Sequence, residues 1–147
     1  AASSILIAAR APQFGSQYGK RAFVAVARAL QQFRAKKADE AALLATDRAL
    51  AALCQLCLSH PVSSPDLAAS WDIVFARLPL KVDFEESRRL HRLLFVEARQ
   101  PEGGSFGSLA RAAQALGYLC DVSGQNAHLD SALQRELGMA LASLPQD

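Results

Sequence analysis

Apolar residues recur at helical spacing along most of the chain. From about Lys20 to Ala35 they share one helix face, because residues three and four apart lie one above the other. The same spacing predicts a short helical piece over residues 1–10, which reads as the tail of a helix rather than a signal peptide. Further helices are predicted at about 39–60, 66–78, 83–99, 105–121 and 127–144.

Each predicted helix carries its own apolar stripe, which we expect to be buried. The first two stripes contain Phe23, Val26, Ala27, Leu30 and Phe33, then Leu43, Leu50, Leu53, Cys54 and Cys57. The next two contain Leu67, Trp71, Val74, Phe75 and Leu78, then Phe84, Leu90, His91, Leu94, Phe95 and Ala98. The last two contain Phe106, Leu109, Ala113, Leu116 and Cys120, then Leu129, Leu133, Leu137, Ala140, Leu141 and Leu144.

Proline and glycine separate these helices, and the pieces recur with a regular period. The second helices of successive pairs are centred near Arg48, His91 and Arg135, roughly 43 residues apart, which is typical of HEAT-type repeats. We therefore expect an all-α fold, an α-α superhelix of about three helical hairpins after the partial helix at residues 1–10. The predicted repeats are 17–60, 66–100 and 104–145 of a single array. A four-helix bundle explains the amphipathic pattern but not the recurrence.

Composition agrees with helices and limits the partners. Hydrophobic residues make up 51% of the chain, Ala and Leu dominate, and no apolar run approaches the roughly 18 residues that span a bilayer. We expect no membrane partner. The net charge of +2 is too small to indicate direct nucleic-acid binding. Three cysteines are an odd number, which favours a reducing compartment over a disulfide framework.

Candidate metal ligands and nucleophiles lack the neighbouring residues that a metal site or an active site requires. Cys54, Cys57 and His60 have metal-like spacing, but no second Cys/His pair completes a site, so we expect buried core thiols. The Gly–Ser segments at 15–19 and 104–107 follow no predicted strand and read as loops rather than nucleophile elbows. His91 reads as a packing residue. We therefore predict no enzyme activity, no cofactor and no metal.

Acidic residues gather where second helices begin, and they allow two interpretations. Asp39, Glu40, Asp83, Glu85 and Glu86 are placed to stabilise helix starts through the dipole and unpaired N–H groups. Alternatively, they form an acidic patch that binds a Lys/Arg-rich peptide. Nearby arginines either make this surface basic or pair with the acids: Arg88, Arg89, Arg92 and Arg99.

The segment Leu78–Glu86 (Leu-Pro-Leu-Lys-Val-Asp-Phe-Glu-Glu) resembles a corner in late HEAT repeats of importin-β-type (karyopherin-β) nuclear transport receptors. The most similar branch is the one that includes importin-4 and importin-5. Phe14-Gly15 with Tyr18 resembles the family's loop before an outer helix. Ala45-Thr46-Asp47 followed by Ala49–Leu53 resembles an inner helix. The resemblance covers about residues 1–100 and is weaker beyond Pro101.

The resemblance implies the C-terminal part of a carrier that shuttles between cytoplasm and nucleus. It implies basic cargo such as histones and ribosomal proteins on a concave face, and nucleoporin Phe-Gly repeats between outer helices. Ran-GTP is expected to act through N-terminal repeats that this chain lacks. Carried over residue by residue, Asp47, Asp83, Glu85 and Glu86 become candidate cargo contacts. The chain departs from the family in having Arg48, where the family often has Asn, and in being slightly basic.

Two alternatives remain open. The arginines and the pI allow a helical-repeat RNA-binding protein, and the repeat pattern alone allows a HEAT-type scaffold for another protein partner.

Overall fold

A computed structural model of the chain describes residues 2–33, 39–125 and 127–143. All regular structure in these residues is helical, which confirms the all-α prediction. The helices are α1 (Ala2–Ala8), η1 (Gly15–Gly19), α2 (Lys20–Gln32), α3 (Glu40–Ser59), η2 (Pro61–Ser63), α4 (Leu67–Arg77), α5 (Phe84–Ala98), η3 (Pro101–Phe106), α6 (Leu109–Val122) and α7 (Ser131–Ala142). The expectations for Arg34 to Lys37, for Asn126 and for Leu144-Pro145 lie outside the described residues.

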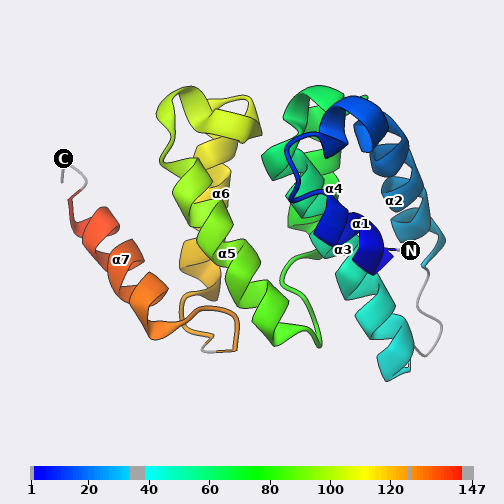
Figure 1. Cartoon of the computed structure of the whole chain (residues 1–147). Helices are drawn as coiled ribbons and strands as arrows, with labels where there is room; N and C mark the ends of the chain where they lie inside the picture. The colour runs from blue at the N-terminus through cyan, green and yellow to red at the C-terminus, as the bar shows by residue number, and fades with distance from the viewer. Residues whose placement is uncertain (1, 34–38, 126, 144–147) are drawn as a thin grey trace.

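The helices form successive groups across the molecule (Figure 1). Helices α1 to α4 form one end, α5 and α6 lie in the middle with α6 behind α5, and α7 lies at the other end. Helix α3 packs against α1, α2, α4 and α5, and α5 packs in turn against α6. The arrangement agrees with an array of helical repeats, and the predicted superhelix stays a prediction.

Helix α3 is the centre of the N-terminal end. Asp39 starts it, because its carboxylate accepts a hydrogen bond from the Ala42 amide at 2.8 Å. Every residue from Ala49 to Cys57 is buried, including the polar Gln55, so this stretch has no exposed face, whereas the spacing predicted a single buried stripe. Among the described helices, α3 is the one long and apolar enough to cross a membrane, with a mean hydropathy of 1.5. Four neighbouring helices cover it here, as expected of a core helix.

Side-chain caps set the starts of the later helices. Asp66, Asp83, Ser108 and Asp130 each accept a hydrogen bond from the amide three residues on. The predicted starts of α4 and α5 are confirmed to within a residue or two. The predicted starts at 105 and 127 are wrong by about four residues, because Ser108 and Asp130 serve as caps outside their helices.

The buried face of α6 differs most from the predicted one. Ala112, Ala115, Leu119 and Val122 are buried, whereas the predicted Ala113 is exposed. Apolar residues occupy two neighbouring phases of this helix, so spacing alone does not separate them. Four more residues predicted to be buried are exposed because each lies at or next to a helix end, where fewer neighbours cover it: Phe33, Phe84, Leu109 and Leu141.

Helix η3 closes the core over α4. The Trp71 indole N–H donates to the Ser105 carbonyl at 3.2 Å, and the Trp71 and Phe106 ring centroids lie 4.6 Å apart. Gly103 makes this turn possible: its φ is +85°, and a Cβ there would lie 2.3 Å from the Ser108 carbonyl oxygen. The segment 104–107, predicted as a loop, is therefore a tight turn that packs against the core.

Candidate functional site

Asp47 organises the corner on which the family resemblance rests. Its side chain is 3% exposed and projects from α3 toward the turn before α5. The carboxylate accepts hydrogen bonds from three successive amides: Lys81 at 2.9 and 3.0 Å, Val82 at 2.7 Å and Asp83 at 3.0 Å. A buried carboxylate needs several donors to offset its desolvation, and the turn supplies them. Asp47 therefore joins α3 to the corner.

Asp83 is also occupied within the chain. One carboxylate oxygen caps α5 by accepting from the Glu86 amide at 3.2 Å. The other lies 2.6 Å from Arg48 Nε, an ion pair without hydrogen-bond geometry. Arg48, the residue that departs from the family pattern, thus balances a carboxylate of the corner.

Glu86 belongs to a third set of contacts across α1, α3 and α5. Its carboxylate accepts from Arg89 Nε at 2.9 and 3.0 Å, and Arg10 of the segment after α1 lies 3.5 Å away. Arg89 also donates to the Gln55 side chain of α3 at 2.8 Å. Glu86 is buried, because these partners cover it.

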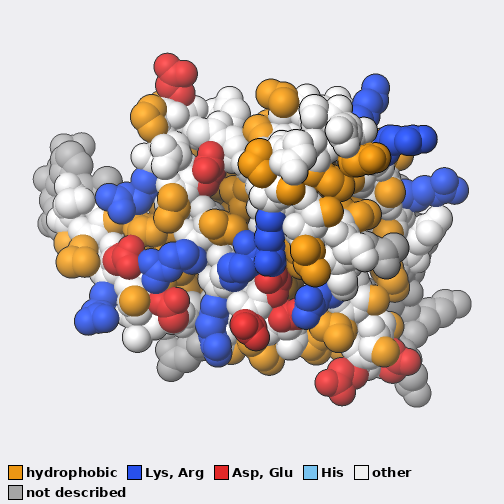
Figure 2. Space-filling model, viewed as in Figure 1, with side chains coloured by type: hydrophobic (Ala, Val, Ile, Leu, Met, Phe, Trp, Pro, Cys, Tyr) orange, Lys and Arg blue, Asp and Glu red, His pale blue; other side chains and the backbone are white. Residues whose placement is uncertain are grey.

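Glu85 differs from the other three predicted cargo contacts. It is exposed on the first turn of α5, whereas Asp47 and Glu86 are buried and Asp83 is half-buried. The corner brings all four residues close together, but three of them contact partners inside the chain. Positive and negative side chains alternate across this face of the molecule (Figure 2), so the predicted acidic patch is a mixed surface.

A second polar cluster lies on the other side of α5, and the sequence pattern identified one of its members. His91, expected to be a packing residue, is fully buried. Its Nδ1 lies 3.0 Å from the His128 carbonyl and its Nε2 lies 2.6 Å from the Tyr118 hydroxyl. Because a carbonyl only accepts, Nδ1 carries the proton and Nε2 accepts from Tyr118. Ser87 Oγ lies 3.0 Å from His128 Nδ1.

Burial keeps these imidazoles neutral. Desolvation lowers the pKa of His91 to about 4, against a smaller opposing effect of the hydrogen bond to His128. Desolvation also lowers the pKa of His128, and the charge of Arg88 lowers it further. Neutral, hydrogen-bonded rings of this kind are structural contacts.

The cysteines behave as predicted for core thiols. Cys54 and Cys57 are fully buried, and burial raises the pKa of Cys54 to about 12 and raises that of Cys57 as well. Within the described ranges, no group of three or more His, Cys, Asp or Glu residues is placed to hold a metal ion.

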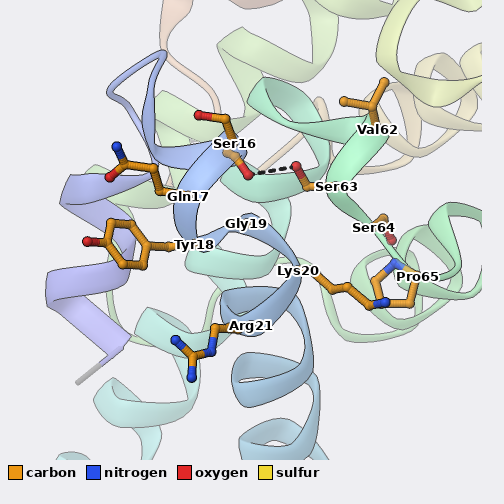
Figure 3. Close-up of a pocket in the computed structure, with 11 residues that line it drawn as sticks. Ser16, Gln17, Tyr18, Gly19, Lys20, Arg21, Val62, Ser63, Ser64 and Pro65 are labelled. Atoms are coloured by element: carbon orange, nitrogen blue, oxygen red, sulfur yellow. Dashed lines mark hydrogen bonds between the residues drawn. The ribbon is translucent and has the colours of Figure 1, made fainter.

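A polar cavity of about 430 Å³ lies between η1 and η2, in a segment expected to be loops (Figure 3). Ser63 Oγ donates to the Gly15 carbonyl at 3.1 Å and ties the two short helices together. A Cβ at Gly19 would lie 2.6 Å from Ser63, so glycine permits this approach. Lys20 and Arg21 line the cavity at the start of α2.

Comparison of the chain with models of protein families, with curated proteins and with solved structures finds no match. Family and function are therefore inferred from the residues and their arrangement.

Proposed function

We propose that this chain is a HEAT-type repeat segment of a karyopherin-β nuclear import receptor, with a non-catalytic role in binding basic protein cargo. Cargo of this class includes histones and ribosomal proteins. The proposal also assigns the family's other partners, nucleoporin Phe-Gly repeats and, through further repeats, Ran-GTP. Shuttling between cytoplasm and nucleus follows from the same assignment.

The contact between Asp47 and the 81–83 turn carries this proposal. The two segments that resemble the family, Ala45–Leu53 and Leu78–Glu86, are the two that this contact joins. An array of stacked repeats needs each helical pair to be fixed to the next. A carboxylate of α3 that binds the turn opening α5 provides such a joint.

The cargo surface proposed here centres on Glu85. Its exposed carboxylate is free to meet a lysine or arginine of a partner, and Arg48, which would repel such a partner, is paired with Asp83. Exposed ion pairs contribute little each, so one such contact gives weak, salt-sensitive binding. Asp47 and Glu86 instead maintain the shape of the corner.

A binding measurement with a histone-tail peptide tests this proposal. We expect Glu85→Lys to weaken binding by about fivefold at low ionic strength, and less at high salt. Asp121→Lys, at an exposed position near the end of α6, makes the same change of charge away from the corner and serves as the control. Equal affinities for the wild-type protein and the Glu85→Lys variant would remove the cargo surface.

Retention on immobilised Phe-Gly repeat peptides separates a carrier from a scaffold. A transport receptor retains such peptides, because passage through the pore depends on them. Absence of retention would leave a HEAT-type scaffold as the better description.

A further inference from the structure

The small net charge conceals a strong separation of charge along the chain. Seven of the sixteen Lys and Arg residues, and none of the fourteen Asp and Glu residues, precede Asp39. The first 38 residues thus carry +7 and the remaining 109 carry −5. Four of these cations, Arg10, Lys20, Arg21 and Arg28, lie in the described residues 2–33, which contain no Asp or Glu.

Three of these cations lie on the exposed side of α2. Lys20, Arg21 and Arg28 are exposed, and no carboxylate among the described residues forms an ion pair with them. Arg10, in contrast, is paired with Glu86. The positive charge on α2 is therefore unbalanced within the described part of the molecule.

The cations border two neighbouring depressions. Lys20 and Arg21 line both the cavity between η1 and η2 and a shallow groove of about 590 Å³ along α2. Val24 lies in this groove between Lys20 and Arg28 and is 53% exposed. Around the cavity, the exposed Tyr18 and Val62 add apolar surface, and the Lys20 side chain extends toward Pro65 (Figure 3).

The spacing of Lys20, Val24 and Arg28 on α2 indicates the kind of ligand that fits this face. Lys20, Val24 and Arg28 are four residues apart, so they form one ridge, with the two cations about 12 Å apart along the axis. An extended peptide advances about 3.3 Å per residue, and alternate side chains share a face. Two carboxylates four residues apart, with an aliphatic residue midway, match this ridge.

We propose that the exposed face of α2 and the adjoining cavity form a docking surface for an acidic peptide segment of a partner protein. The segment has the pattern acid–any–aliphatic–any–acid. Its carboxylates pair with Lys20 and Arg28, its aliphatic side chain packs on Val24, and flanking residues enter the cavity beside Arg21. This surface is separate from the basic-cargo surface at Glu85. The docking proposal does not depend on the transport assignment.

Nucleic acid is the poorer ligand for this surface. Proteins that bind single strands stack bases on several aromatic side chains and contact many phosphates. The cavity and groove together offer one aromatic residue, Tyr18, and three cations. Such a site gives weak, non-specific binding to RNA.

Fluorescence anisotropy with a short synthetic peptide tests the proposal. The probe repeats the pattern with glutamate at the acidic positions and leucine at the aliphatic ones, and a second peptide replaces each glutamate by glutamine. We expect the wild-type chain to bind the glutamate peptide at low salt. The double variant Lys20→Glu/Arg28→Glu should weaken binding at least tenfold, and Val24→Ser a few-fold.

The double variant Arg77→Glu/Arg135→Glu provides the matched control, because it makes the same change in net charge at exposed positions on α4 and α7. Circular dichroism melting checks that all variants fold. Equal losses in the two double variants would show general electrostatics and overturn the proposal. It would also be overturned by equal binding of the glutamine peptide, by no binding to the wild type, or by tighter binding of oligouridine through Lys20 and Arg28.

Discussion

The two sides of α5 are held by different chemistry. Toward α3, charged groups make the junction: the Asp47 carboxylate binds the amides of residues 81–83, and Arg89 of α5 donates to the Gln55 side chain of α3. Toward α6 and the turn before α7, neutral groups make it: His91 bonds to Tyr118 and to the His128 carbonyl. Arg92 also forms partly exposed ion pairs with Asp130 and Glu136 beside this second junction.

The two junctions of α5 should respond differently to mutation and to acid. The junction with α3 depends on one buried side chain that satisfies three backbone donors, so losing that side chain leaves the donors without partners. The junction with α6 depends on the imidazoles of His91 and His128, which are neutral only at pH values above their pKa. Mutation should therefore damage the first junction most, and acid should act on the second.

The largest effect is expected at Asp47. Asp47→Ala removes a buried carboxylate that accepts from three successive amides, and we expect a loss of about 4 kcal/mol in the free energy of unfolding, measured by urea denaturation. Asp66→Ala, which removes a capping carboxylate bonded to one amide, should cost about 1 kcal/mol. Similar losses in the two variants would contradict a special role for the Asp47 junction.

A smaller effect is expected from acid. The pKa of His91 is about 4 in the folded chain and near 6.5 when unfolded, so the unfolded state binds more protons between these values. The contribution of neutral His91 to stability is complete above pH 6.5 and is lost as the pH falls toward 4. We expect a loss on the order of 2 kcal/mol between pH 7 and pH 5.

His91→Gln provides the comparison, since its amide retains a donor and an acceptor but does not titrate. Its unfolding free energy should fall less over the same pH interval, and most of the remaining change should belong to His128. An unchanged slope in this variant would show that His91 does not control the acid sensitivity.

The smallest effect is expected for the ion pairs of Arg92. They are partly exposed, so Arg92→Ala should cost less than about 1 kcal/mol, and the cost should shrink further in 1 M salt. Arg135→Ala, at an exposed position on α7 with no ion pair among the described residues, is the control. A loss that persists in high salt would point to packing of the arginine stem instead.

The sequence predicted α1 to α7, with the starts of α6 and α7 about four residues too early, and it contained a signal for Asp47 as well. Asp47 follows Leu43 by four residues and precedes Leu50 by three, so it interrupts the apolar stripe of α3. A carboxylate on a buried stripe requires internal partners. The resemblance makes Asp47 a candidate cargo contact, whereas its position on the helix predicts partners within the chain, which the structure shows.

The spacing of apolar residues could not predict other features, because these depend on contacts between segments far apart in the sequence. His91 bonds to Tyr118 of α6 and to His128 of the turn before α7. Spacing within one helix does not reveal these two partners. The same holds for the approach of η1 to η2 through Gly19 and Ser63. On α6, alanines on two adjacent faces left the orientation undetermined.

The joint formed by Asp47 also bears on stiffness. An array of helices bends most where successive pairs can rotate, and three hydrogen bonds to consecutive amides resist rotation of the 81–83 turn. Strain imposed by a large partner should then be absorbed mainly beyond α5, where α7 is attached through a turn, partly exposed ion pairs and two buried leucines, Leu133 and Leu137. If bending is concentrated near α7, the geometry between α3 and α5 stays constant while α7 changes its orientation relative to them.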